Sequence, residues 1–332
     1  MNKHKFPMTA LLTLLLLVSI TVSILFGSVP VDLADLCRYL ITRQANPTVH
    51  TLITTVRIPR ALGGLFAGIG LSCSGVLLQT VMNNALASPA TIGVNSGSGF
   101  GAMIAMMLFP HSIFFLPLSA FAGALLTSFA VFALAYATDS SRTTIILAGI
   151  TISSFLNAGI NTIKILDTEL SVNLTSFLIG SLSGLTLKKL SLPCLIILAA
   201  FLLSCCFGRH LNILGLGDDV AYSLGLNVPL TRLFLLTLSS LLAGSVVSYA
   251  GLLSFVGLIV PHICRQLLGN DARILLPSSA LLGGSFVLCC DLLGRILFRP
   301  FELPVGIIMA FVGGPFFLYL LLKKKGGRRV NA

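Results

Sequence analysis

Side chains that could carry out acid–base chemistry are scarce in this sequence, which holds only 10 Asp and Glu residues. Asp291 precedes Arg295 by four residues within a long apolar stretch, which is the favourable order for an ion pair on one face of a helix. In a membrane-embedded helix, such a pair is either a structural ion pair or part of a proton relay. We place it toward the outer end of its helix, a position that favours the structural pairing.

Metal, nucleophilic and nucleotide chemistry have no supporting pattern. His262 follows Pro261, but no second metal ligand stands three or four residues further on, and Arg265 occupies the first of those positions. The motifs HExxH, GxSxG and GxxxxGK[ST] are absent from the sequence. The 8 cysteines form no C-x-x-C pair and lie mostly in apolar runs. We therefore expect neither an enzyme nor a cofactor or metal site in this chain.

The polar stretch Leu211–Pro229 separates two apolar segments and carries a recognisable local pattern. Asp218 is a good helix N-cap, and Gly225 stands where a helix of about two turns would need a left-handed C′ residue. Val220 and Leu224 are four residues apart and would share one face of that helix. We predict a short helix held by two loops outside the bilayer. An ordinary polar loop is the alternative interpretation.

The composition identifies a membrane protein. Of the 332 residues, 56% are hydrophobic and 9% are charged, whereas a soluble domain has about a quarter charged residues. Mean hydropathy is +1.01. The net charge of +11 does not indicate a nucleic-acid partner, because no folded polar domain is present to display such a surface. We predict an all-α polytopic membrane protein.

Apolar runs of span length predict about ten transmembrane helices within a single membrane domain, residues 1–332. The first run, Met8–Phe26, is too long for a signal peptide and ends without a cleavage site, so we expect an uncleaved helix. Segment 32–55 is expected to be a loop, either irregular or with one short surface helix, and the Gly/Ser-rich segment 166–183 a re-entrant or surface helix. The predicted spans cover residues 8–26, 61–82, 92–109, 112–137, 143–163, 190–208, 232–250, 251–268, 274–294 and 304–322, with a cytoplasmic loop over 209–231.

The basic residues set the orientation. Of the 21 Lys and Arg residues, 12 fall on the side predicted to be cytoplasmic, where the KKKGGRR tail lies, and 9 fall outside. This is a weak positive-inside bias, and it places both termini in the cytoplasm. So many basic residues outside are unusual and predict an acidic partner on that face.

Small residues recur at every fourth position in the predicted second and third spans. Such stripes allow helices to approach closely, and lining a solute pathway is the alternative role. The stripes consist of Gly64, Gly68 and Ser72, and of Gly93, Gly97 and Gly101.

Long, ordered motifs from Arg57 to Leu322 resemble the FecCD-type permease family, the membrane subunits of ABC importers for ferric siderophores, haem and vitamin B12. The motifs are RIPRALGGLFAGIGLSCSGVLLQ, NNALASPATIGVNSGSGFG, GLLSFVGLIVPHICRQLLGNDARILLPSSALLGG and CDLLGRILFRPFELPVG. Two departures concern substrate contacts. Asn84-Ala85-Leu86-Ala87 stands where the family often has Asn-Pro-Leu-Ala, and SFLIGSLSG lacks a Trp that is common in the family.

The resemblance implies a ten-helix bundle like the vitamin B12 importer permease, in the cytoplasmic membrane of a bacterium. The implied partners are a second permease copy or close homologue, two ATP-binding cassette subunits, and an extracytoplasmic substrate-binding protein. Solute would pass between the two permeases, while ATP is hydrolysed on the separate subunits. The implied cargo is an iron complex, with a ferric siderophore first and haem or cobalamin as alternatives. A secondary transporter or channel is disfavoured, because no ionisable site is visible near the midplane.

The resemblance assigns Arg57, Arg60 and Arg295 to docking of the binding protein. Arg57 and Arg60 are three residues apart, so they would share a face at the outer membrane edge. In a dimer this basic set is doubled, which suits carboxylate patches on a two-lobed partner. Snorkelling of the arginines to lipid phosphates is the alternative role.

Two further sites are assigned by resemblance. Leu86, Arg142 and Thr143 match the inner gate region, where ordinary loop packing is the alternative. The acid-Val-Ala-x-x-x-Gly pattern resembles the EAA-x-x-x-G element by which membrane subunits of ABC importers dock on their ATPase. The residues assigned to ATPase coupling are Asp218, Asp219, Val220, Ala221, Leu224 and Gly225.

Overall fold

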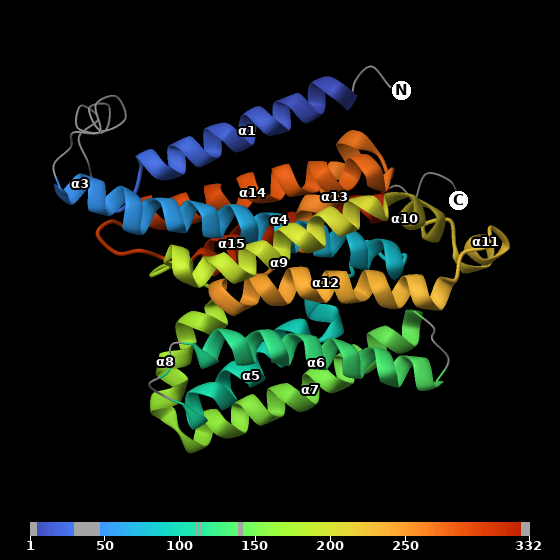
Figure 1. Ribbon diagram of the computed structural model, residues 1–332, viewed down its shortest axis with the longest axis horizontal. Helices are drawn as coiled ribbons and strands as arrows, with labels where there is room; N and C mark the ends of the chain where they lie inside the picture. The colour runs from blue at the N-terminus through green and yellow to red at the C-terminus, as the bar shows by residue number, and fades with distance from the viewer. Residues whose placement is uncertain (1–4, 30–46, 110–111, 113, 139–141, 327–332) are drawn as a thin grey trace.

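The computed structural model describes residues 5–29, 47–109, 112, 114–138 and 142–326, and within these ranges the chain is helical without strands. Most helices run along the long axis of the molecule, and α8 lies across one end of the bundle (Figure 1). The elements are α1 (Lys5–Leu25), α3 (Pro47–Thr51), η1 (Leu52–Arg57), α4 (Ile58–Val81), η2 (Pro89–Ile92), α5 (Val94–Leu108), α6 (Phe115–Thr138), α7 (Arg142–Leu166), α8 (Thr168–Ile179), α9 (Leu187–Cys206), α10 (Gly208–Leu214), α11 (Asp218–Ser223), α12 (Val228–Ala250), α13 (Val256–Leu268), α14 (Ala272–Ile296) and α15 (Val305–Gly326).

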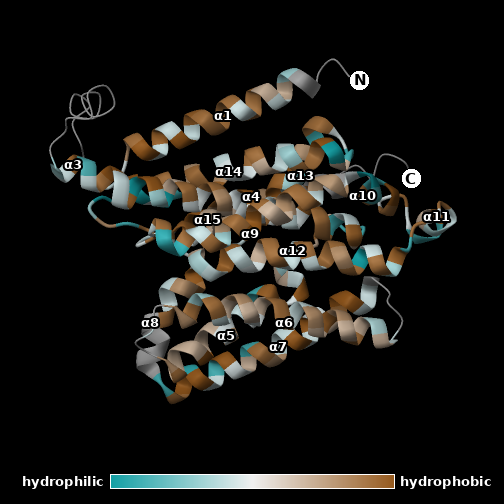
Figure 2. Ribbon diagram, viewed as in Figure 1, coloured by the Kyte–Doolittle hydropathy of each residue, from teal (hydrophilic) through white to brown (hydrophobic). Residues whose placement is uncertain are grey.

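The predicted all-helical membrane fold is confirmed, whereas the expected number of about ten spans stays a prediction. In the described part of the chain, 7 helical segments are long and apolar enough to cross a membrane, and the shorter apolar helices α5, α13 and α15 accompany them. Each predicted span overlies one of these elements. Figure 2 shows hydrophobic residues along the helices and hydrophilic residues around α10 and α11. The assignment of residues 1–332 to a single domain stays a prediction.

The two ends of the bundle differ in what they carry. We call them the α8 end, where α3 and α8 lie, and the α11 end, where α10 and α11 lie (Figure 1). α1 begins and α15 finishes at the α11 end. Both ends of the described chain are therefore on one side, as an even number of crossings requires.

Two predicted span boundaries are wrong. α3, η1 and α4 form one continuous apolar helical segment of 35 residues, Pro47–Val81, so part of the expected 32–55 loop is helical. α13 begins at Val256 rather than at residue 251, because Gly251 (φ 71°) and Phe255 (φ 68°) adopt left-handed backbone conformations. Segment 166–183 contains α8, which at 12 residues is too short to span.

Close packing around α4 accounts for the small-residue stripes. In the segment that ends with α4, 78% of the most apolar stretch (its apolar window) is buried inside the molecule, whereas only 17% of the corresponding window of α1 is buried. A Cβ added at Gly68 would lie 2.1 Å from the carbonyl oxygen of Gly283 in α14, and one at Gly75 would lie 1.9 Å from that of Gly257 in α13. In α5, a Cβ added at Gly97 or Gly101 would lie 2.4 or 2.2 Å from the carbonyl oxygen of Gly123 or Ser119 in α6. Both stripes therefore serve helix packing.

Backbone hydrogen bonds join three segments at the α8 end. The N–H of Ser181, just after α8, donates to the carbonyl oxygen of Ala250 at 2.8 Å. The N–H of Gly306, in the first turn of α15, donates to the carbonyl oxygen of Gly180 at 3.1 Å. The irregular 251–255 segment is thus held between α8 and α15.

Candidate functional site

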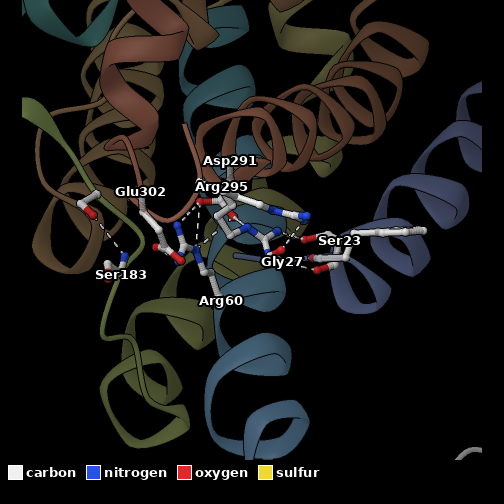
Figure 3. Close-up of polar contacts among 10 residues, drawn as sticks. Ser23, Gly27, Arg60, Ser183, Asp291, Arg295 and Glu302 are labelled. Atoms are coloured by element: carbon white, nitrogen blue, oxygen red, sulfur yellow. Dashed lines mark hydrogen bonds and ion pairs between the residues drawn. The ribbon is translucent and has the colours of Figure 1, made fainter. Parts of the chain in front are cut away.

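Arg60, near the start of α4, lies between two carboxylates from distant parts of the chain (Figure 3). Its Nε lies 3.0 and 3.1 Å from the two carboxylate oxygens of Asp291 in α14. Its Nη1 lies 2.6 Å from Oε2 of Glu302 in the loop before α15. Asp291 also faces Nε of Arg295 at 3.0 Å, one helical turn further on. The predicted structural pairing of Asp291 with Arg295 is confirmed, and Arg60 and Glu302 extend it to a four-residue network.

Two arginines at the same end hold the last turn of α1. Nη1 of Arg57 donates to the carbonyl oxygen of Leu25 at 2.6 Å. Arg295 donates from Nη1 to the carbonyl oxygen of Phe26 at 3.1 Å and from Nη2 to the hydroxyl of Ser23 at 2.8 Å. The last carbonyl groups of a helix have no partner within it, and a cation there also complements the negative end of the helix dipole. These guanidinium groups therefore cap α1.

The three arginines lie inside the chain, and their predicted docking role stays a prediction. Arg57, Arg60 and Arg295 are 3%, 6% and 2% exposed. Their charges face groups of this chain and join α1, α4 and α14, so as placed here they do not form an exposed basic surface. The acidic and carbonyl groups that accept from them come from within the chain. The basic residues exposed at this end, among those described, are Lys188, Lys189 and Arg299.

Glu302 is the network member that the sequence reasoning missed. Its side chain is 30% exposed in the loop outside the apolar helices. Burial opposes its ionisation, but hydrogen bonds from Ser28 and Arg60 and the charge of Arg60 outweigh that effect and hold the pKa of Glu302 below its ordinary value. Because the chain has only 10 acids, an acid beside the end of a span is a candidate ion-pair partner, and this signal was available.

α11 is the short helix expected at the other end of the bundle, and its two ends form differently. Its N-cap is Gly217 (φ 113°) rather than the predicted Asp218, which is instead the first helical residue. At the C-terminus, Gly225 adopts φ 79° as predicted. The N–H of Gly225 donates to the carbonyl oxygen of Tyr222 at 2.9 Å, and the N–H of Leu226 donates to the carbonyl oxygen of Ala221 at 3.1 Å. These two bonds form a Schellman motif, which ends the helix.

The exposed surface of α11 carries three large side chains, with Val220 and Leu224 on one side of the helix, Tyr222 on the other, and the exposed Asp219 and Ser223 between them. Val220, Tyr222 and Leu224 are 43%, 76% and 59% exposed, whereas Ala221 is fully buried. Ala221 therefore packs within this chain, and its predicted role as a close-approach position for a partner stays a prediction. Tyr222 was not predicted to belong to this surface, although an exposed aromatic residue in a two-turn helix is a signal for a contact. Asp219 is exposed beside them.

Polar contacts fasten α10 and α11 to the membrane helices. Asp218 forms an ion pair of 2.8 Å with Arg232 in α12. Asn212 in α10 donates from Nδ2 to Oδ1 of Asp271 at 2.8 Å and accepts from the N–H of Ala272 at 2.7 Å. Hydrogen bonds from the Arg273 side chain, then from Asn212, hold the pKa of Asp271 well below its ordinary value. The loop is thus anchored at both ends, and Asp219, Val220, Tyr222, Ser223 and Leu224 of α11 and its cap are left exposed.

The predicted inner-gate residues lie in two separate elements. Leu86 is 49% exposed in the turn after α4, where its N–H donates to Oδ1 of Asn84 at 2.9 Å. Thr143 is exposed at the start of α7. Arg142 is the first residue of α7, and its side chain lies outside the described residues. A gate formed by these positions stays a prediction.

α7 combines an apolar composition with an exposed polar face. Its apolar window is only 22% buried, so much of the helix is uncovered in a single chain. The polar residues on the uncovered surface are hydroxyl and amide side chains without charge. They are Thr151, Ser154, Asn157, Asn161 and Thr162.

The apolar helices, with a short amphipathic helix fastened between two of them, define a multi-pass membrane protein of the transport-permease class. The model of the FecCD transport family matches residues 15–323, and the chain belongs to that family. The sequence-based identification is therefore confirmed. The chain is an ABC transporter permease, a membrane transport subunit.

Known relatives and a solved structure agree with this family. The chain is 35% identical over 324 residues to the Fe(3+)-citrate import system permease protein YfmE of Bacillus subtilis, covering 96% of each chain. It is 37% identical over 278 residues to the cobalamin import system permease protein BtuC of Halobacterium salinarum, covering 82% of this chain and 74% of that one. A solved inward-facing structure of a transporter assigned to the metal-chelate ABC type is 31% identical, with a TM-score of 0.85 over 96% of this chain and 99% of that one.

Proposed function

We propose that this permease takes up an iron complex, with a ferric siderophore as the first candidate cargo and haem or cobalamin as alternatives. The Fe(3+)-citrate relative supports an iron complex as cargo, and the cobalamin relative supports the cobalt-containing alternative. α11 is the observation that carries the mechanism, because it exposes Val220, Tyr222 and Leu224 on a face that the Asp218–Arg232 ion pair fastens to α12. Such a face is suited to burial in a cleft of a partner protein.

In this proposal the partner at α11 is an ATP-binding cassette subunit, one for each of two permease copies. ATP is bound and hydrolysed there, so the permease supplies the docking helix and no nucleotide site. Val220, Tyr222 and Leu224 enter the cleft of the ATPase, and Asp219 lies near its rim. Closure of the ATPase pair then pulls on α11 and, through the Asp218–Arg232 ion pair, on α12.

The distribution of charge supports an external energy source over a cation-coupled carrier. In the described apolar helices other than the continuous segment Pro47–Val81, every Asp, Glu, Lys and Arg lies within the first five or last six residues of its helix. In Pro47–Val81, Arg57 contacts the last turn of α1 and Arg60 contacts Asp291 near the end of α14, so both lie toward the α8 end. Cation-coupled carriers place ionisable or ion-coordinating groups near the midplane instead. The energy for transport therefore enters through a partner.

The uncovered polar face of α7 is the proposed wall of the solute pathway, formed between two permease copies. Its hydroxyl and amide groups can hydrogen-bond a polar solute, but they supply no anionic ligand for a bare metal cation. Such a wall suits a chelate whose iron is already fully coordinated. The second copy is either identical or a close homologue.

We assign the α8 end to the outside of a bacterial cytoplasmic membrane and the α11 end, with both termini, to the cytoplasm. The substrate-binding protein then docks at the α8 end. The exposed Lys188, Lys189 and Arg299 replace the buried arginines as the basic contacts for acidic groups of that protein. Exposed pairs of this kind are worth about 1 kcal/mol or less each, so they steer the partner more than they hold it.

Proteoliposomes containing the permease, its ATPase and the binding protein test the proposal. Uptake of a radiolabelled ferric siderophore should require ATP and the binding protein. Leu224→Asp should weaken ATPase binding by about tenfold or more, because burial of a Leu side chain is worth about 1.5–3 kcal/mol. Leu224 is 59% exposed, so the fold should tolerate the change.

Asn227→Asp is the matched control for this variant. It adds the same charge to the same loop, and Asp can replace the Asn side chain that accepts from the N–H of Leu230 at the N-cap of α12. This variant should bind the ATPase like the wild type. Equal ATPase affinity of Leu224→Asp and the wild type would refute the coupling role of α11, and ATP-independent uptake would refute the proposed class of transport.

A further inference from the structure

A groove between α6 and α12 lies beside Arg232, the residue that ties α11 to α12. Its volume is about 580 Å³, within the range of about 300–1,000 Å³ that is common for small-molecule sites. Phe129, Ala133 and Tyr136 of α6 form one wall, and Leu230 and Leu233 of α12 form the other. All five are exposed, so the groove is open along its length.

One charged residue lines this apolar groove. Arg232 of α12 is 7% exposed and forms the 2.8 Å ion pair with Asp218 of α11. It is the fifth residue of α12, roughly 6 Å along the axis from the start of the helix. A helix of 23 residues is slightly longer than the hydrocarbon core of a bilayer is thick. The depth of Arg232 therefore corresponds to the boundary between acyl chains and headgroups.

We propose that the groove binds an anionic phospholipid, with one acyl chain between α6 and α12 and the phosphate beside Arg232. Both walls are helices long and apolar enough to cross a membrane, so the groove opens to the bilayer. A guanidinium group has five donors in a planar fork and can contact a carboxylate and a phosphate together. Tyr136 adds an aromatic side chain with a hydroxyl group, a type enriched at membrane interfaces.

The site would place a lipid next to the anchor of α11. Arg232 is the residue that ties Asp218 to α12, so the phosphate and the Asp218 carboxylate share one cation. A zwitterionic lipid carries a compensating positive group and gains less from this cation. The inference depends on the membrane setting of the helices and not on the cargo or the ATPase.

Native mass spectrometry of the purified full chain tests the site. The chain is incubated with equal amounts of phosphatidylglycerol and phosphatidylcholine that have identical acyl chains. A charge-assisted contact of ordinary strength predicts that phosphatidylglycerol is retained about tenfold more than phosphatidylcholine. Ala133→Trp should abolish retention because the indole fills the groove. Ala130→Trp places the same bulk at an exposed position of α6 outside the groove and should retain lipid like the wild type.

Arg232→Gln separates the charge from the apolar contact. It should bring the retention of the two lipids close to equal while some lipid remains bound. Equal retention by Ala133→Trp and Ala130→Trp would overturn the proposal, and so would a wild type without preference for phosphatidylglycerol. If Arg232→Gln does not fold, the two Trp variants decide the question. Cross-linking of Ala133→Cys to a second copy, without bound lipid, would assign the groove to a protein interface and also overturn the proposal.

Discussion

Replacement of Asp291 by Asn tests whether the network at the α8 end holds the bundle together. Asp291 is 1% exposed and faces Arg60 and Arg295, both of which are buried. Asn has nearly the same shape but no charge, so two buried guanidinium groups would share Glu302 as the remaining carboxylate of the network. Removal of one partner from a buried ion pair costs about 3–5 kcal/mol. Because Glu302 still compensates Arg60, we expect about 3 kcal/mol, the lower limit of that range.

Two further variants test which interactions cause the loss of unfolding free energy in Asp291→Asn. Glu302→Gln removes a carboxylate that is 30% exposed, and solvent screening should limit its effect to about 1 kcal/mol. The double variant Asp291→Asn/Arg295→Met removes the cation together with its partner. Residues in one buried network are not additive, so the double variant should be less destabilised than the sum of its single changes by about 1 kcal/mol or more.

The free energy of unfolding can be measured by SDS titration of the purified chain in mixed micelles, with helicity followed by circular dichroism. The expected order of destabilisation is Asp291→Asn above Glu302→Gln. If the two variants are equally stable, or if the double variant is strictly additive, the buried network does not stabilise the bundle as described. In that case Arg295 acts only as a cap on α1.

Three other predictions follow from the structure. Asp271→Asn should lower the free energy of unfolding at neutral pH, and the difference from the wild type should shrink as the pH falls below about 4. The reason is that the Asp271 carboxylate, whose pKa is lowered in the fold, stabilises the fold only while it is ionised. A difference in thermal melts that is constant with pH would contradict this. Lys188→Glu/Lys189→Glu should weaken docking of the binding protein, with a smaller effect at high salt and unchanged ATPase binding, as measured by surface plasmon resonance; unchanged affinity at low salt would remove these lysines from the docking surface. Cysteines at Thr151 and Ser154 should react with a water-soluble maleimide, whereas one at the buried Ala148 should not; equal labelling at all three positions would show that the exposed face of α7 does not line an aqueous path.

Features that depend on residues close in sequence were predictable. Gly225 ends α11 because a Schellman motif needs only a residue that tolerates positive φ after one helical turn. The Asp291–Arg295 pair followed from a spacing of four residues. The N-cap of α11 was not predictable in the same way, since Gly217 and Asp218 are both acceptable caps and the path of the chain decides between them.

Features that depend on contacts between distant segments were not predictable. Arg57 donates to backbone carbonyl groups at the end of α1, more than 30 residues earlier. Every residue has a carbonyl group, so such a partner leaves no sequence signal. The burial of Ala221 likewise depends on how α11 packs on its neighbours. The family motifs therefore indicated which residues matter, but not whether they face a partner or the interior of their own chain.

The glycine contacts of α4 also determine which parts of the bundle can move. At Gly68 and Gly75 the backbones of α14 and α13 approach so closely that a carbonyl oxygen occupies the space of a Cβ. Close-packed surfaces of this kind have few alternative registers, so α4, α13 and α14 would shift as one rigid body. α7 and α9, whose apolar windows are each 22% buried, are less enclosed than that body, so we expect them to tilt against it, and α1 to pivot about the last turn that Arg57 and Arg295 hold. Opening a path for solute is then a tilt of peripheral helices around a fixed centre. Substitutions that loosen this centre should impair every step of the transport cycle rather than one conformation.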